Sequence, residues 1–128
     1  MIYLDTSVAL AQLLAEDRRP PDSLWDETLV SSRLLEYELW NRVNAHGLAV
    51  SHDEPVRGLL GRLTFLELAR PVLERALEPF PKPIRTLDAL HLASMDFLRR
   101  QGQSLRLASY DERLVAAARQ MKFATVDL

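Results

Sequence analysis

The sequence predicts an α/β fold, a three-layer α/β/α sandwich around a central parallel sheet of about five strands. Two observations predict it. Short apolar runs alternate with longer segments of helical periodicity, which is typical of parallel strands joined by right-handed helical crossovers. The apolar runs are also nearly continuous, without the alternation of polar residues that a half-exposed sheet requires, so helices should cover both faces of the sheet.

The predicted strands are the shortest elements, with three or four residues each, and most of their residues are apolar. They cover residues 2–4, 28–31, 65–68, 105–108 and 123–126. Capping residues help to bound the helices: Gly47 and Gly102 each follow a helix, and Pro71 lies in the first turn of another. The predicted helices cover residues 8–15, 32–45, 53–63, 71–77, 86–101 and 109–121, with one further turn at 24–27.

We expect one domain over residues 1–128. The 48% of hydrophobic residues can form a core, and Pro79, Pro81 and Pro83 form a stiff connector between segments that are too small to fold alone. The absence of cysteine excludes disulfides, a thiol nucleophile and cysteine-ligated metals, and fits a cytoplasmic location. No apolar run approaches the roughly 18 residues of a membrane span, so we expect no membrane association.

Acidic residues gather near the ends of predicted strands or at the starts of helices. Asp5 comes directly after the first strand, and Asp111 lies three residues after the fourth. Ligands of parallel α/β sheets bind beyond the carboxyl ends of the strands, so several acids should converge at one edge. The candidates are Asp5, Glu38, Asp88, Asp111 and Asp127.

Each acid also has a structural explanation that stays open at this point. Asp5 would cap the first helix, and Asp88 would complement the dipole of the helix that it opens. Asp111 lies inside an expected capping box from Ser109 to Glu112.

Glu38 is the hardest of these acids to explain structurally. On its helix it projects between Leu34 and Leu35, and an acid among apolar residues is costly unless it is paired or bound to a metal. The alternative is an ion pair with Arg42, one turn later.

Four gathered carboxylates repel one another, so a protein that collects them usually holds a cation there. Oxygen donors without cysteine or paired histidine favour magnesium or manganese over zinc. Such an ion lowers the pKa of a bound water and neutralises a phosphate. The acids therefore predict Mg²⁺- or Mn²⁺-assisted chemistry on a phosphate.

Four segments resemble the motifs of a known family, the PIN domains. They are residues 2–7, 31–39, 86–93 and 108–114, which contain Asp5, Glu38, Asp88 and Asp111 respectively. The segment around Asp88 is the most specific match. The order and spacing of these motifs and the length of the chain are similar to those of VapC-type toxins, and this resemblance covers nearly the whole chain.

The resemblance implies an endoribonuclease that depends on magnesium or manganese. It makes Asp5 and Asp88 direct metal ligands, with Glu38 and Asp111 completing the pocket directly or through water. The hydroxyls of Thr6, Ser7 and Ser109 would hold carboxylates or water. His91 would be a packing and hydrogen-bonding residue, and Asp127 receives no role.

The resemblance also implies partners. These are an RNA substrate, a cognate antitoxin that occludes the active site, and a second copy of the chain in a homodimer. The net charge of −2 does not itself point to RNA, although fourteen of the sixteen basic residues are arginine, which suits phosphate. A carboxylate pocket also accepts an arginine or lysine side chain, so we expect the antitoxin to insert one.

Other classes fit less well. Receiver domains need a lysine after the last strand, where Asp127 stands, and aspartate-nucleophile phosphatases need an acid where Ser7 stands. A housekeeping RNA-processing nuclease of the same fold and a non-catalytic RNA-binding domain remain as alternatives to a toxin.

Overall fold

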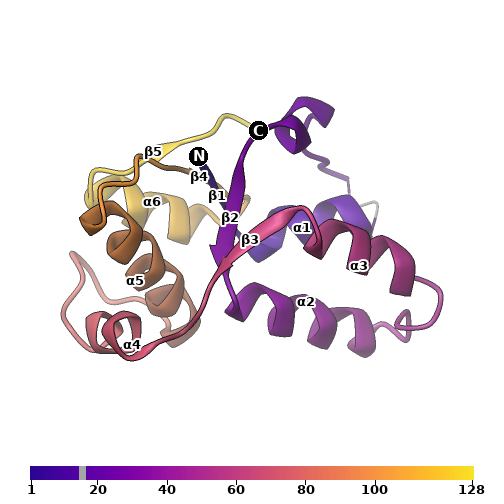
Figure 1. Ribbon diagram of the computed structural model, residues 1–128, viewed down its shortest axis with the longest axis horizontal. Helices are drawn as coiled ribbons and strands as arrows, with labels where there is room; N and C mark the ends of the chain where they lie inside the picture. Colours follow the sequence, from indigo (N-terminus) through magenta and orange to yellow (C-terminus); the bar gives the residue numbers. More distant parts are fainter. Residues whose placement is uncertain (15–16) are drawn as a thin grey trace.

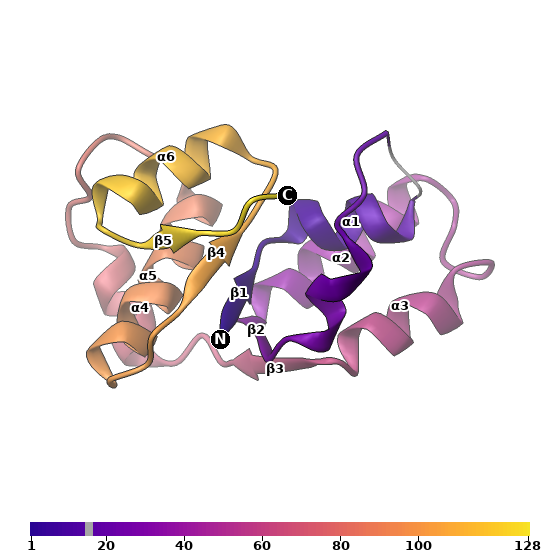
Figure 2. The ribbon, with the colours of Figure 1, turned by 90° about the horizontal axis from the view of Figure 1, so that it is seen from above.

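The computed structural model describes residues 1–14 and 17–128. Five parallel strands form one sheet in the order β3-β2-β1-β4-β5. The predicted α/β/α sandwich is confirmed: α1, α2 and α3 cover one face of the sheet, and α4, α5 and α6 lie on the other side (Figures 1 and 2). The strands are β1 (Ile2–Leu4), β2 (Leu29–Ser32), β3 (Leu63–Leu66), β4 (Arg106–Ala108) and β5 (Ala124–Thr125).

The helices lie close to the predicted ranges, with differences at their ends. They are α1 (Thr6–Leu13), α2 (Leu34–Ala45), α3 (Asp53–Leu60), α4 (Arg70–Ala76), α5 (Thr86–Arg100) and α6 (Glu112–Gln120), and a 3₁₀ turn, η1, covers Asp22–Asp26. The predicted end of the first helix at Ala15 falls outside the described residues. None of the helices in the described ranges is long and apolar enough to cross a membrane.

Side chains of the central strand alternate between two cores, one on each face of the sheet. Ile2 and Leu4 pack with Val8 and Leu39 on the side of α1 and α2. Tyr3 points to the other face, where the second core includes Leu92 and Leu107, among others. Because β1 is buried on both faces, its sequence is continuously apolar, which is why the pattern predicted a covered sheet.

The parallel register brings distant residues to one edge of the sheet. Leu4 lies beside Ala108 in the pairing of β1 with β4, and the Asp5 N–H donates to the Ala108 carbonyl (3.0 Å). The loops that follow β1 and β4 are therefore neighbours, although more than a hundred residues separate them in the sequence.

Candidate functional site

Asp5 is held at the carboxyl edge of the sheet through one of its two carboxylate oxygens. Its Oδ2 accepts hydrogen bonds from the Ser109 hydroxyl (2.8 Å) and from the hydroxyl and backbone N–H of Ser7 (2.6 and 3.3 Å). Asp5 is buried, and its Oδ1 has no hydrogen-bond donor among the residues that the structure describes. One oxygen thus fixes the side chain while the other stays available.

Glu38 is held in the same manner from the neighbouring helix. Its Oε1 accepts hydrogen bonds from the Thr6 hydroxyl and from Nε2 of His91, both at 2.7 Å. Within the described ranges its Oε2 has no such donor, and the alternative ion pair with Arg42 is not formed. Glu38 is therefore tied to the first turn of α1 and to α5, rather than to its own helix.

His91 confirms the prediction of a packing and hydrogen-bonding residue. It is buried, its Nδ1 lies 2.7 Å from the Tyr3 hydroxyl, and its Nε2 faces Glu38. Burial lowers the pKa of His91, but the hydrogen bond to Glu38 and the charges of Asp5, Glu38 and Asp88 outweigh it and leave the pKa above its ordinary value. The sequence did not predict the partner Tyr3.

Asp88 lies in the first turn of α5, half-buried and in the field of the other acids. Its pKa is raised, first by burial and then by the negative charges of Asp111 and Asp5, while His91 and Arg85 act in the opposite direction. The charges of Asp5 and Asp111 therefore act on Asp88, and those of Asp5, Glu38 and Asp88 act on His91.

Asp111 is the N-cap of α6, and the predicted capping box is wrong. Its Oδ1 accepts hydrogen bonds from the backbone N–H groups of Arg113 and Leu114 (3.0 and 3.3 Å). Helix α6 begins only at Glu112, so Ser109 belongs to the loop, where its hydroxyl bonds Asp5 and accepts from the Asp111 N–H (2.9 Å). Ser109 thus links two acids instead of capping a helix.

The donor set suits a hard divalent cation in chemical type. Across the two described ranges, no three His, Cys, Asp or Glu side chains are close enough to hold a metal ion as they stand. The acids nevertheless supply only oxygen donors, and Asp5 and Glu38 each keep one oxygen free of hydrogen bonds from described residues. Carboxylate oxygens are the ligands that Mg²⁺ and Mn²⁺ prefer, so the residues fit such an ion in type.

Three basic side chains border Asp88. Lys82, Arg85 and Arg113 line a hollow of about 390 Å³ together with Asp88. Among the described residues, none of the three forms an ion pair with an acid. Unpaired cations beside a carboxylate group favour a ligand that carries negative charge of its own.

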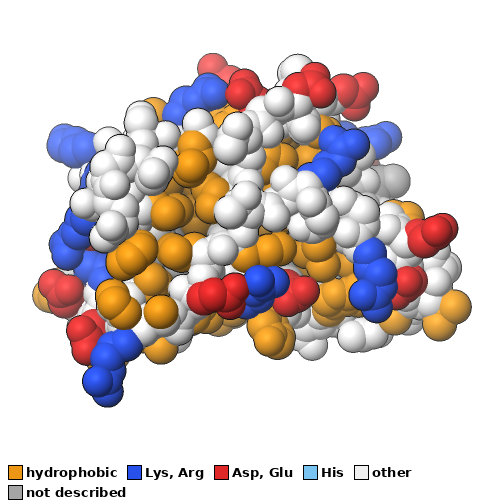
Figure 3. Space-filling model, in the orientation of Figure 1, with side chains coloured by type: hydrophobic (Ala, Val, Ile, Leu, Met, Phe, Trp, Pro, Cys, Tyr) orange, Lys and Arg blue, Asp and Glu red, His pale blue; other side chains and the backbone are white. Residues whose placement is uncertain are grey.

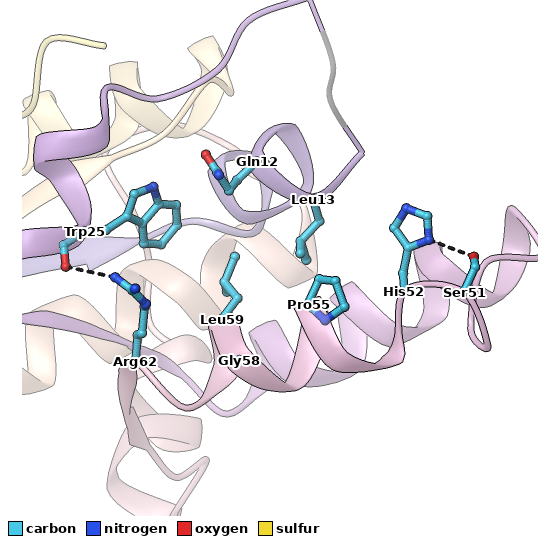
Figure 4. A pocket seen from close by; sticks show the side chains of 9 residues that line it. All are labelled: Gln12, Leu13, Trp25, Ser51, His52, Pro55, Gly58, Leu59 and Arg62. Atoms are coloured by element: carbon cyan, nitrogen blue, oxygen red, sulfur yellow. Dashed lines mark hydrogen bonds between the residues drawn. The ribbon is translucent and has the colours of Figure 1, made fainter.

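Two other features lie near or outside this region. Asp127 follows β5 in an exposed tail and lines a hollow of about 480 Å³ with Arg18, Ser109 and Tyr110, among others. A separate hollow of about 460 Å³ lies between α1, η1 and α3, where Trp25 and Gln12 face the cavity (Figure 4). It contains none of the four acids.

Comparisons with known proteins identify the family of this chain. The model of the PIN domain family matches residues 2–120. The chain is 32% identical to Ribonuclease VapC47 of Mycobacterium tuberculosis, covering 98% of this chain and 95% of the relative, and 33% identical to Ribonuclease VapC35 of the same species, covering 98% and 96%.

Two solved structures share the fold. A toxin–antitoxin complex from Klebsiella pneumoniae has a TM-score of 0.70 at 16% identity, covering 99% of this chain and 97% of that one. The Mycobacterium tuberculosis toxin VapC20, which cleaves the sarcin–ricin loop, has a TM-score of 0.67 at 21% identity, covering 91% and 95%.

Proposed function

Since this chain belongs to the PIN-domain family as a VapC-type ribonuclease, we propose that it is the toxin of a toxin–antitoxin pair, an endoribonuclease that hydrolyses RNA phosphodiester bonds with a carboxylate-bound Mg²⁺ or Mn²⁺. One observation carries the proposal. Asp5 and Glu38 are each anchored through one oxygen, and the pKa of Asp88 is raised by burial and by the charges of Asp111 and Asp5. Such a group of acids is costly unless a cation joins it.

Asp5 and Asp88 would bind the metal directly, and Glu38 and Asp111 would bind it directly or through water. When bound, a divalent cation lowers the pKa of a coordinated water and neutralises charge on the phosphate. Thr6, Ser7 and Ser109 keep the acids in place through their hydroxyl hydrogen bonds. Lys82, Arg85 and Arg113 would hold RNA phosphates beside Asp88.

The first prediction is RNA cleavage that needs a divalent cation. We expect exhaustive chelation to abolish cleavage and Mg²⁺ or Mn²⁺ to restore it. The products should carry 5′-phosphate and 3′-hydroxyl ends, because water attacks the phosphorus instead of the ribose 2′-hydroxyl. The measurement is cleavage mapping on total RNA with end-specific labelling of the products.

Full activity after chelation would contradict the metal requirement, and a 2′,3′-cyclic phosphate would show a different mechanism. An inert Asp5→Asn protein provides the control for contaminating nucleases, because the purification is the same and one carboxylate is lost.

We further propose a single nuclease domain over residues 1–128 that acts in the cytoplasm as a homodimer. A second copy would cover the apolar groove between α4 and the proline connector, a hollow of about 690 Å³ whose lining includes Leu73, Leu77 and Phe80. Leu77 is 88% exposed, and apolar side chains gather on this face over α4 and α5 (Figure 3). Exposed apolar patches of this kind favour a protein partner.

The second prediction concerns the antitoxin. We expect a segment of it to place an arginine or lysine near Asp5, Glu38 or Asp88, where it would take the place of the metal. Manganese should therefore weaken the complex, and Glu38→Gln should weaken it in metal-free buffer. Calorimetry on the complex purified from the native operon measures both effects.

The matched control is Glu74→Gln, which removes one exposed acid from α4 outside the site. If the two variants bind the antitoxin equally well, or if a structure of the complex shows no contact near the acids, the proposed mode of inhibition is wrong.

A further inference from the structure

Glu38 is held by a line of buried groups that crosses the protein from the sheet to α2. The Ser32 N–H lies 3.2 Å from the Tyr3 hydroxyl, which lies 2.7 Å from Nδ1 of His91. Nε2 of the same ring lies 2.7 Å from Oε1 of Glu38. The line joins β2, β1, α5 and α2, and Tyr3 and His91 are at most 1% exposed.

The proton positions in this line follow from the groups themselves. A phenol has an ordinary pKa of about 10, so the Tyr3 hydroxyl keeps its proton at neutral pH. The Tyr3 hydroxyl accepts from Ser32 and donates to Nδ1 of a neutral His91, which leaves the ring proton on Nε2. In a charged His91 both nitrogens carry protons. In either case the nitrogen that faces Glu38 is a donor.

Packing alone does not account for this arrangement. A buried imidazole and a buried phenol each cost free energy unless their polar atoms are bonded, and an apolar pair would fill the same core more cheaply. Here the Tyr3 hydroxyl and both ring nitrogens of His91 are hydrogen-bonded, and the line ends on Glu38, an acid of the candidate site. Its effect is to occupy Oε1 and leave Oε2 as the oxygen open to a ligand.

We propose that Tyr3 and His91 are positioning residues that fix the orientation of the Glu38 carboxylate. His91 supplies the donor, and Tyr3 fixes the ring that carries it. This inference rests on the proposed function where it concerns the metal, because an oriented Glu38 matters to catalysis only if Glu38 helps to hold the ion. The hydrogen-bonded line itself is independent of any metal.

The first experiment uses the metal-free protein. Nitrogen-15 NMR of the histidine side chains should show His91 protonated on Nε2 in the wild type. Tyr3→Phe removes the hydroxyl and keeps the ring, and it should shift the Nδ1 resonance of His91, whereas the exposed His46 and the half-buried His52 should not change. A His91 ring protonated only on Nδ1 would overturn the inference, whatever the protein does with metal or RNA.

The second experiment measures Mn²⁺ binding by electron paramagnetic resonance without RNA. Tyr3→Phe should weaken binding about 10-fold, within the range of 10- to 100-fold typical of residues that orient metal ligands. His91→Asn should weaken it more, and His91→Gln should recover part of the loss because its amide nitrogen can reach the position of Nε2.

Val43→Ala is the matched control. Val43 is fully buried in the helix that carries Glu38, but it takes no part in the line, so its truncation lowers stability and should leave Mn²⁺ affinity within about twofold. If Tyr3→Phe also leaves the affinity unchanged, the positioning role is wrong. If the wild type binds no Mn²⁺ while His91 carries its proton on Nε2, the proposed function fails and the line of hydrogen bonds stands.

Discussion

Replacing Asp88 with asparagine should reduce RNA cleavage by more than about 100-fold, beyond the loss typical of residues that only support a metal site. The same change should raise the metal-free melting temperature. Asparagine keeps the shape of the side chain and deletes a charge that burial, Asp111 and Asp5 all disfavour. Relief of this repulsion should stabilise the metal-free protein by on the order of 1 kcal/mol. Calorimetric melting without metal and a cleavage assay with metal measure the two effects.

The opposite outcome has an equally definite meaning. If Asp88 only complements its helix dipole, losing the charge costs about 0.3–1 kcal/mol and leaves catalysis intact. Magnesium provides a second comparison, because an ion that binds the folded state stabilises it by mass action. The wild type should gain stability from magnesium, and the Asp88→Asn protein should gain much less.

The pH dependence of this difference has a fixed sign. Because the pKa of Asp88 is raised in the folded protein, its favourable contribution to stability is complete below its ordinary value of 3.8 and is lost as the pH rises through the folded value. The stability advantage of Asp88→Asn should therefore be largest at neutral pH. It should shrink as the pH falls toward 3.8.

Replacing Asp96 with asparagine should lower the free energy of unfolding by about 3 kcal/mol and the melting temperature by about 10 °C. This is the largest loss of stability that we expect from a single substitution. Asp96 is buried in α5, and its carboxylate pairs with Arg75 (2.8 Å), Arg99 (2.9 Å) and Arg100 (3.1 Å). Arg75 and Arg99 also stack on Phe80 and Phe123, so this one acid links α4, the connector and the segment after α6 to α5. Without it, partly buried arginines lose their counter-charge.

Asp53→Asn is the control for this prediction, since the Asp53–Arg57 pair is exposed and should contribute less than about 1 kcal/mol. Burial raises the pKa of Asp96, but its hydrogen bonds to Arg75 and Arg99 and the charge of Arg100 outweigh burial and lower it. The stabilisation that Asp96 provides is therefore present above pH 3.8 and is lost as the pH falls through the lowered pKa of Asp96. Equal melting curves for the two variants would refute the role of Asp96.

The sequence predicted the sheet and its helices because apolar periodicity reports burial directly. Ile2, Tyr3 and Leu4 are all buried, and that continuity indicated a strand covered on both faces. Ends of elements were less predictable. The strand β3 begins at Leu63, two residues before the predicted start, because Leu63 packs into the first core.

Local sequence rules failed where a distant partner competes for a side chain. Ser109 and Glu112 have the spacing of a capping box, but Asp5 takes the Ser109 hydroxyl and Asp111 caps the helix instead. Likewise Arg42 is correctly spaced to pair with Glu38, yet His91 and Thr6 hold it. These contacts depend on which strands are neighbours.

The cluster around Asp96 was missed for the same reason. An aspartate followed by Arg99 and Arg100 resembles an ordinary exposed helix face with pairs one turn apart. Only the packing of α4 on α5 brings Arg75 against it and buries the carboxylate.

The strand order determines when the candidate site can be completed during synthesis of the chain. Asp5, Glu38 and Asp88 precede β4 in the sequence, whereas Ser109 and Asp111 follow it and reach Asp5 through the pairing of β4 with β1. Proteins emerge from the ribosome amino-terminus first. A nascent chain that has not yet released β4 and the loop after it therefore holds Asp5, Glu38 and Asp88 but lacks Asp111 and the serine that fixes Asp5. Under the proposed function, a chain released before β4 should therefore be unable to cleave RNA.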